Sequence, residues 1–224
     1  MPRAGWVKPV DDQRLSDHVA LGSLTRTFPP DLVDGIIEST GKGEQRNRLL
    51  PARLVAYYVL ALSLFSQSGY EEVMRSLVEG LSWQDGWQRR WSVPSQPALT
   101  QARTRLGVEP LEVLFKTACV PLAREDTPEA FRFGRRLVSM DGTTLDVPDN
   151  DENEEAFGRP GTSRGERAAF PQLRLVALAE SGTHAMFAAA IGAYADGENV
   201  LAQQLTARAG PGMLVLADRG FGGS

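Results

Sequence analysis

The sequence is poor in the side chains that build many metal and hydrolase sites, because it holds one cysteine, Cys119, and two histidines, His18 and His184. A single cysteine excludes an internal disulfide framework and a cysteine-rich zinc site. Two histidines so far apart in the chain argue against a histidine-ligated metal and against a Ser-His-Asp triad. These absences direct the search for a catalytic site to the carboxylates.

A long hydrophobic run is also missing. The longest apolar stretch, LVAYYVLALSLF from Leu54 to Phe65, falls short of the roughly 18–20 residues that cross a bilayer. We predict that it forms a buried core helix. The N-terminal sequence MPRAGWVKPVDDQR lacks the apolar segment of a signal peptide. A cytoplasmic protein without a membrane partner is therefore expected.

Neither sign of charge dominates the chain. Residues 1–136 carry 18 Lys/Arg against 16 Asp/Glu (+2), and residues 137–224 carry 6 against 12 (−6), which sum to the net charge of −4. This asymmetry is compatible with an N-terminal half that contacts DNA. An excess of two positive charges does not by itself identify nucleic acid as the partner.

The N-terminal half has the apolar spacing of helices. Helical patterns begin at Pro30, after Pro51, near Tyr70, after Ser95 and at Pro110. The last two are separated by the short turn GVE. They could form a DNA-reading helix-turn-helix, or they could be two helices packed in a core; the pattern fits both.

After Arg136 the pattern changes to strands. RLVSMDGTTLDV is a first strand, PQLRLVALAE and HAMFAAAIGAY form a hairpin around SGT, NVLAQQLTARAG is a helix, and GMLVLAD is a last strand. The expected fold class is α+β, with a helical domain at 1–136 and a domain of four strands and one helix at 137–224.

Two acids occupy special places in this strand order. Asp141 lies on the first strand and Asp218 directly follows the fourth. A helical crossover returns the chain beside the first strand, so the two carboxylates are expected to face each other. Like charges at that distance repel unless a cation lies between them, and Mg²⁺ or Mn²⁺ prefers oxygen ligands. Asp146 is an odd number of positions from Asp141, so we expect it on the opposite face, at the strand end.

The segments LVSMDGTTLDVPD, FPQLRLVAL and LVLADRGF together resemble the catalytic core of DDE transposases of the insertion sequence 4 family. RLLPARLVAYYVLALSLFSQSGYEEVMRSL and PSQPALTQARTRLGVEPLEVLF resemble that family's N-terminal domain. The resemblance implies a helical DNA-binding domain followed by a ribonuclease-H-like domain. It also implies a cut-and-paste transposase that acts as a homodimer on double-stranded DNA, at the terminal inverted repeats and the target, and that is nucleoid-associated when bound. Asp141 and Asp218 would be catalytic and would bind Mg²⁺ or Mn²⁺.

The sequence departs from the family pattern in one respect. The third acid, a Glu in a Tyr-Arg-Glu-Lys pattern, would lie beyond Ser224. We therefore expect an incomplete ribonuclease-H-like domain and a truncated, catalytically deficient protein. The alternative is a non-catalytic DNA-binding repressor of transposition. A stand-alone nuclease of the same fold is disfavoured by the helical N-terminal half.

Several arginines are candidate DNA contacts, although each could equally be an ordinary surface residue. Arg103 and Arg105 lie on the helix that follows Ser95. The long connection from Pro148 to Ala169 is expected to be a loop, and Arg219 follows the second acid. The loop candidates are Arg159, Arg164 and Arg167.

Overall fold

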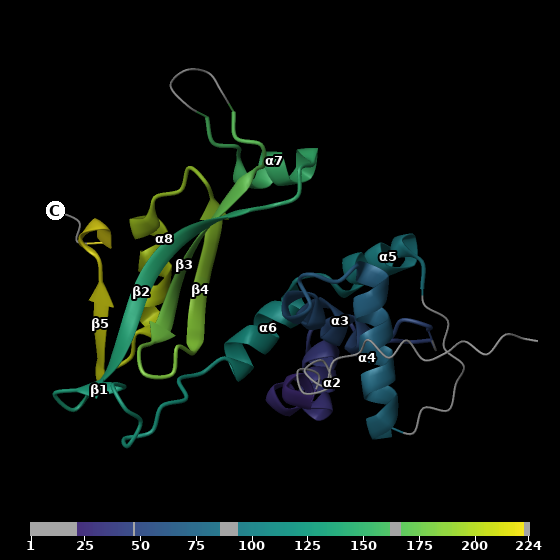
Figure 1. The fold of residues 1–224 in the computed structure, drawn as a ribbon, viewed down its shortest axis with the longest axis horizontal. Coiled ribbons are helices and arrows are strands. Elements are labelled where there is room, and N and C mark those ends of the chain that lie inside the picture. The colour runs from purple at the N-terminus through teal and green to yellow at the C-terminus, as the bar shows by residue number, and fades with distance from the viewer. Residues whose placement is uncertain (1–21, 47, 86–93, 162–166, 222–224) are drawn as a thin grey trace, which may run out of the picture. The chain divides into compact units, whose positions relative to one another are not determined.

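The computed structural model describes residues 22–46, 48–85, 94–161 and 167–221. The chain divides into two compact units, Met1–Ala118 and Cys119–Ser224 (Figure 1). The first unit is helical and the second contains the sheet, as the α+β expectation requires. None of the helices in these described residues is long and apolar enough to span a bilayer.

The helical unit consists of helices that begin where the sequence predicts. They are α2 (Pro30–Ser39), α3 (Ala52–Leu64), α4 (Tyr70–Asp85), α5 (Gln96–Leu106) and α6 (Glu109–Ala118). Pro30 occupies the first turn of α2, where its missing N–H costs nothing. The predicted apolar helix α3 is the centre of the core, since Tyr57, Tyr58 and Ala61 are all buried.

The α5–α6 connection is the short turn that the sequence predicts. Gly107 ends α5 with a φ of 73°, a conformation that favours glycine. Ser95 holds the N-cap position of α5, but its side chain makes no capping hydrogen bond there. α5 packs against α3, and α6 packs against α2. Both helices therefore contribute to the core, and DNA reading by this pair stays a prediction.

The second unit is built on a five-stranded sheet. Its strands are β1 (Phe131–Arg132), β2 (Arg135–Asp146), β3 (Gln172–Glu180), β4 (Met186–Ala193) and β5 (Met213–Ala217). β2, β3 and β4 pair antiparallel in chain order, and β5 returns to pair parallel with β2. The return passes through α8 (Glu198–Leu205) and a short 3₁₀ turn. The predicted hairpin is confirmed as β3 and β4. The predicted pairing of the first long strand with the last is confirmed as β2 and β5.

Two elements of this unit were not predicted. β1 is a two-residue strand that pairs with β2. α7 (Asp151–Phe157) lies within the connection that we expected to be a loop. Its N-cap residue Asn150 accepts a hydrogen bond from the backbone N–H of Asn153 at 2.8 Å, which stabilises the first turn of the helix.

The division between the units falls at Ala118, whereas the sequence analysis put it near Arg136. Between these two positions the chain contacts Glu180, a fully buried acid at the end of β3. Its carboxylate accepts hydrogen bonds from the backbone N–H groups of Leu122 and Ala123, at 3.0 and 2.7 Å, and it also pairs with Arg136. These contacts hold the segment that precedes β1 to the sheet.

The two faces of the sheet are covered differently. On one face α8 lies against the strands (Figure 1), and Val138, Val176 and Leu178 are completely buried there. Side chains of the alternate positions point to the other face. Of these, Leu145 is 46% exposed and Leu216 is 50% exposed.

Candidate functional site at the β2–β5 strand pair

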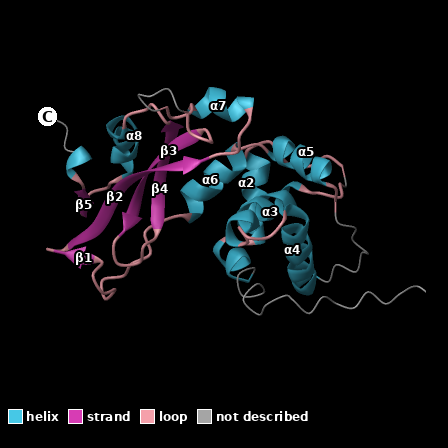
Figure 2. Cartoon of the chain, turned by 45° about the horizontal axis from the view of Figure 1, so that its top comes forward, coloured by secondary structure: helices cyan, strands magenta, loops and turns pink. Residues whose placement is uncertain are grey.

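The predicted acids lie on two neighbouring strands (β2 and β5 in Figure 2). The parallel register of β2 and β5 ends with Met140 beside Ala217. Asp141 is the next residue of β2, and Asp218 directly follows the end of β5. Adjacent strands are spaced about 4.8 Å apart, so residues 77 positions apart in sequence (218 − 141) come to neighbouring backbone positions.

Backbone hydrogen bonds orient one oxygen of each carboxylate. Oδ1 of Asp141 accepts from the N–H of Gly142 at 2.8 Å, and Oδ1 of Asp218 accepts from the N–H of Gly220 at 2.8 Å. Both acids are exposed. In the part of the chain that the structure describes, neither forms an ion pair within 4.0 Å. The second oxygen of each carboxylate is therefore available to a ligand.

The donor set fits a hard cation. Mg²⁺ is commonly held by one or two carboxylates, with waters and substrate phosphates completing its coordination. Among the described residues no group of three or more His, Cys, Asp or Glu side chains is placed to hold a metal. The fit is therefore to a two-carboxylate site.

Glu198 is the acid that comes near this site from another element, at the start of α8. Its Cδ lies 3.0 Å from the position that a Cβ on Gly142 would occupy. Gly142 alternates with Asp141 along β2, so Glu198 lies on the face opposite to the Asp141 side chain. Its Oε1 is also taken by Arg174 Nη1 at 2.9 Å. Glu198 does not complete the acid pair.

Asp146 lies at the end of β2, as expected. Its Oδ1 accepts a hydrogen bond from Gln172 Nε2 at 2.7 Å across the strand pair. This contact ties the β2 end to the β3 start, which agrees with a strand-end role.

The candidate arginines after β2 are held by acids of the same segment. Arg159, with a side chain only 10% exposed, pairs with Asp149 and with Glu154, the latter at 2.9 Å. Arg167 also pairs with Glu154. The Arg167 hydrogen bond, and then that of Arg159, lower the pKa of Glu154, and the hydrogen bond to Asp149 raises the pKa of Arg159. Arg164 lies outside the described residues, and DNA contacts by these arginines stay predictions.

The remaining candidate arginines are Arg219 in the sheet unit and Arg103 and Arg105 on α5 of the helical unit. Arg219 is exposed beside Asp218, and it has no ion-pair partner among the residues described. Arg103 is exposed on α5 near Tyr58, where burial raises the pKa of the tyrosine and Arg103 opposes that rise. Arg105, two residues after Arg103 on α5, donates from Nη2 to the carbonyl of Leu50 at 2.8 Å.

Sequence reasoning missed a group of cations around Arg105. Lys42, Arg46 and Arg48 follow α2 and line a pocket together with Arg105. The stretch GKGEQRNR (Gly41–Arg48), with three cations and one acid beside two glycines, was the signal that could have indicated it.

Comparisons with known proteins agree with the resemblance in both units. A family model described as the insertion element 4 transposase N-terminal domain matches residues 18–116, which cover most of the helical unit. The transposase InsG for insertion sequence element IS4 of Escherichia coli (strain K12) is 32% identical over 201 residues, 90% of this chain. The putative transposase InsZ of the same strain is 27% identical over 221 residues, 99% of this chain.

The chain spans 44% of the length of InsG and 71% of that of InsZ. No solved structure matches the chain significantly. The similarity to both transposases extends across the sheet unit as well as the helical unit, because it covers nine tenths or more of the chain.

Proposed function

Because this chain belongs to the insertion element 4 family of transposases, we propose that it acts on DNA in cut-and-paste transposition. The helical unit binds the terminal inverted repeats, and the sheet unit is the ribonuclease-H-like part that carries two catalytic acids. The observation that supports this proposal most is the parallel pairing of β2 with β5, because it brings Asp141 and Asp218 to adjacent positions.

In this proposal the two carboxylates hold Mg²⁺ or Mn²⁺ through their free oxygens. When bound, such ions activate the attacking oxygen and stabilise the leaving oxygen of a phosphodiester. The strands supply the positioning: β2 is fixed by β3 on one side and β5 on the other. The N–H groups of Gly142 and Gly220 fix the carboxylate orientation, so little side-chain freedom is lost when an ion binds.

We further propose that residues 1–224 bind DNA without cutting it. The described residues bring together two acids, and they place no third acid beside them. A cleavage-competent site of this kind would need another carboxylate. The alternative function, a repressor that binds DNA without any metal, shares the DNA binding but predicts no cation site at Asp141 and Asp218.

The test measures cation binding to the intact chain by calorimetric titration with Mg²⁺ and with Mn²⁺. Asp141→Asn and Asp218→Asn should each weaken binding by about tenfold or more, because each removes one of two charged ligands. Asp146→Asn is the matched control, since it makes the same change on the same strand away from the pair. Equal affinity in wild type and Asp141→Asn would overturn the metal site and favour the repressor.

A second measurement separates binding from chemistry. Fluorescence anisotropy with a labelled duplex of the element's terminal inverted repeat should show binding by wild type and by Asp141→Asn alike. Incubation of the same duplex with wild type and Mg²⁺ should yield no strand cleavage. Cleavage by the 224-residue chain would contradict the two-acid interpretation.

A further inference from the structure

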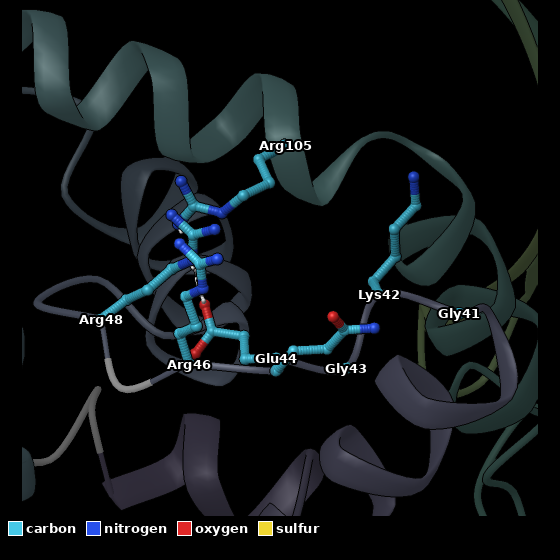
Figure 3. A pocket seen from close by; sticks show the side chains of 8 residues that line it. Gly41, Lys42, Gly43, Glu44, Arg46, Arg48 and Arg105 are labelled. Carbon is cyan, nitrogen blue, oxygen red and sulfur yellow. Dashed lines mark ion pairs between the residues drawn. The ribbon is translucent and has the colours of Figure 1, made fainter.

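The helical unit contains a pocket of about 360 Å³ between the segment that follows α2 and the last turn of α5. Figure 3 shows it from close by. Its lining residues are Gly41, Lys42, Gly43, Glu44, Gln45, Arg46, Arg48 and Arg105.

The backbone at one side of this pocket is fixed by the end of α2. Gly41 has a φ of 68°, its N–H donates to the carbonyl of Glu38 at 3.0 Å, and the N–H of Lys42 donates to the carbonyl of Ile37 at 2.9 Å. This pair of bonds is the Schellman arrangement that ends many helices. Lys42 therefore leaves the helix in a defined direction, toward the pocket.

The opposite wall is fixed by Arg105. Its Nη2 donates to the carbonyl of Leu50 at 2.8 Å, and its side chain belongs to the last turn of α5. The pocket thus has cations attached to two separate, well-anchored elements, which limits the entropy lost when a ligand binds.

The charge of the pocket is strongly positive. Lys42, Arg46, Arg48 and Arg105 carry four positive charges against the single negative charge of Glu44, which leaves +3 (4 − 1). Glu44 is 3.9 Å from Arg105 and 4.0 Å from Arg48, beyond hydrogen-bond distance. Figure 3 shows the guanidinium groups of the three arginines gathered above this one carboxylate, with Lys42 apart from them.

Two of these cations have no acid to balance them. Within the described part of the chain, Lys42 and Arg46 form no ion pair within 4.0 Å. Like charges gathered in a concave site repel each other, and a bound anion would relieve that repulsion. Several guanidinium groups with fixed planar donors suit a phosphate, whose oxygens accept two N–H bonds at once.

We propose that this pocket binds a backbone phosphate of duplex DNA. The charge and the hydrogen-bond donors of the pocket indicate a phosphate. That this phosphate belongs to DNA rests on the proposed function. The contact would position DNA on the helical unit without reading its sequence, since phosphates are the same at every base pair.

The experiment measures DNA affinity of the full chain at several salt concentrations, with a fluorescein-labelled 30-base-pair duplex of arbitrary sequence. Arg46→Gln should reduce the slope of log affinity against log salt by about one, because one phosphate contact is lost. At low salt the affinity should fall by about fivefold to tenfold. Arg75→Gln, an exposed arginine on α4, is the matched control and should leave the slope unchanged.

Glu44→Gln supplies a test of opposite sign. Removing the single carboxylate of the pocket should tighten DNA binding, and this gain should be lost when Arg46→Gln is added. Circular dichroism melting of each variant shows that the helical unit is folded. A gain cannot result from damage to the fold, so this variant keeps the proposal testable even if Arg46→Gln is unstable.

The outcomes separate the two proposals. If the wild-type chain binds DNA but Arg46→Gln and Glu44→Gln keep the wild-type slope and affinity, the pocket inference is wrong and the proposed function stands. If neither the wild-type chain nor any variant binds a duplex, both the pocket inference and the proposed function are wrong. If Arg46→Gln abolishes binding of inorganic phosphate, seen as a lost thermal shift, but does not affect DNA, the pocket takes free phosphate and the DNA assignment is overturned.

Discussion

Two acids on opposite faces of the central sheet, Glu180 and Asp141, have opposite surroundings. On the face that α8 covers, Glu180 is completely buried and is held by Arg136 and by two backbone N–H groups. On the other face, Asp141 is exposed and accepts one backbone hydrogen bond, from its own neighbour in sequence. The two residues lie on paired strands of the same sheet.

The difference separates structural acids from site acids. A buried carboxylate has to be fully paired, because an isolated charge in the interior is very costly, and the bonds of Glu180 leave it no capacity for a ligand. Asp141 and Asp218 keep free oxygens and form no ion pair within 4.0 Å among the described residues. Availability, rather than burial, makes these two the candidates for ligand binding.

The largest expected difference in the free energy of unfolding is between two variants in which a carboxylate is replaced by an amide, one on each face. Glu180→Gln should lower the free energy of unfolding by about 3–5 kcal/mol, because it leaves Arg136 and the N–H groups without their charged partner. Asp141→Asn should change it by no more than about 0.5 kcal/mol in a metal-free buffer, because the residue is exposed. Urea denaturation followed by circular dichroism measures both. Similar costs for the two variants would contradict the distinction between the faces.

A smaller difference is expected for leucines on the two faces. Leu178→Ala removes a fully buried side chain beneath α8 and should cost about 2–5 kcal/mol. Leu216→Ala removes a side chain that is 50% exposed on the other face and should cost less than about 1 kcal/mol. The same urea titrations apply, and Leu145→Ala, which is 46% exposed, serves as a second variant of the open face. If Leu216→Ala were as costly as Leu178→Ala, the open face would be covered in solution.

Much of this arrangement could be predicted from sequence because apolar spacing determines it. The helices that begin at Pro30 and after Pro51, and the strands that lead to Asp141 and Asp218, all have regular apolar patterns. The crossover rule then predicts that β5 lies beside β2. The acid pair followed from these two steps.

α7 was missed because its sequence, DENEEAF, has no apolar periodicity. The helix is stabilised instead by its Asn150 cap and by acids in its first turn, which favour the helix N-terminus. Arg159 was a candidate DNA contact, and the structure pairs it with acids five and ten positions before it. The reversal of charge sign along this segment was visible in the sequence, but the ion pairs between its acids and Arg159 were not.

The basic pocket was missed for a different reason. Lys42, Arg46 and Arg48 come from one segment, and Arg105 comes from a helix more than fifty residues later in the chain. α3 lies between these two parts of the sequence and packs against both α2 and α5. This packing brings the cations together. Composition, at +2 for the first 136 residues, averages such a local cluster away.

The smallest effect is expected for an acid that belongs to neither face. Glu154 of α7 has a pKa below its ordinary value of 4.5, chiefly through its hydrogen bond from Arg167. A lowered pKa in the folded state means that the pair stabilises the protein above about pH 4.5 and that this contribution is lost as pH falls through the lowered value. Glu154→Gln should therefore melt slightly below wild type at pH 7, and the two melting temperatures should converge as the pH falls below the lowered pKa of Glu154. Glu155→Gln, a neighbour on α7 without a described ion-pair partner, controls for the change of net charge. A Glu154→Gln difference that persisted at low pH would show that the side chain acts through packing rather than through its charge.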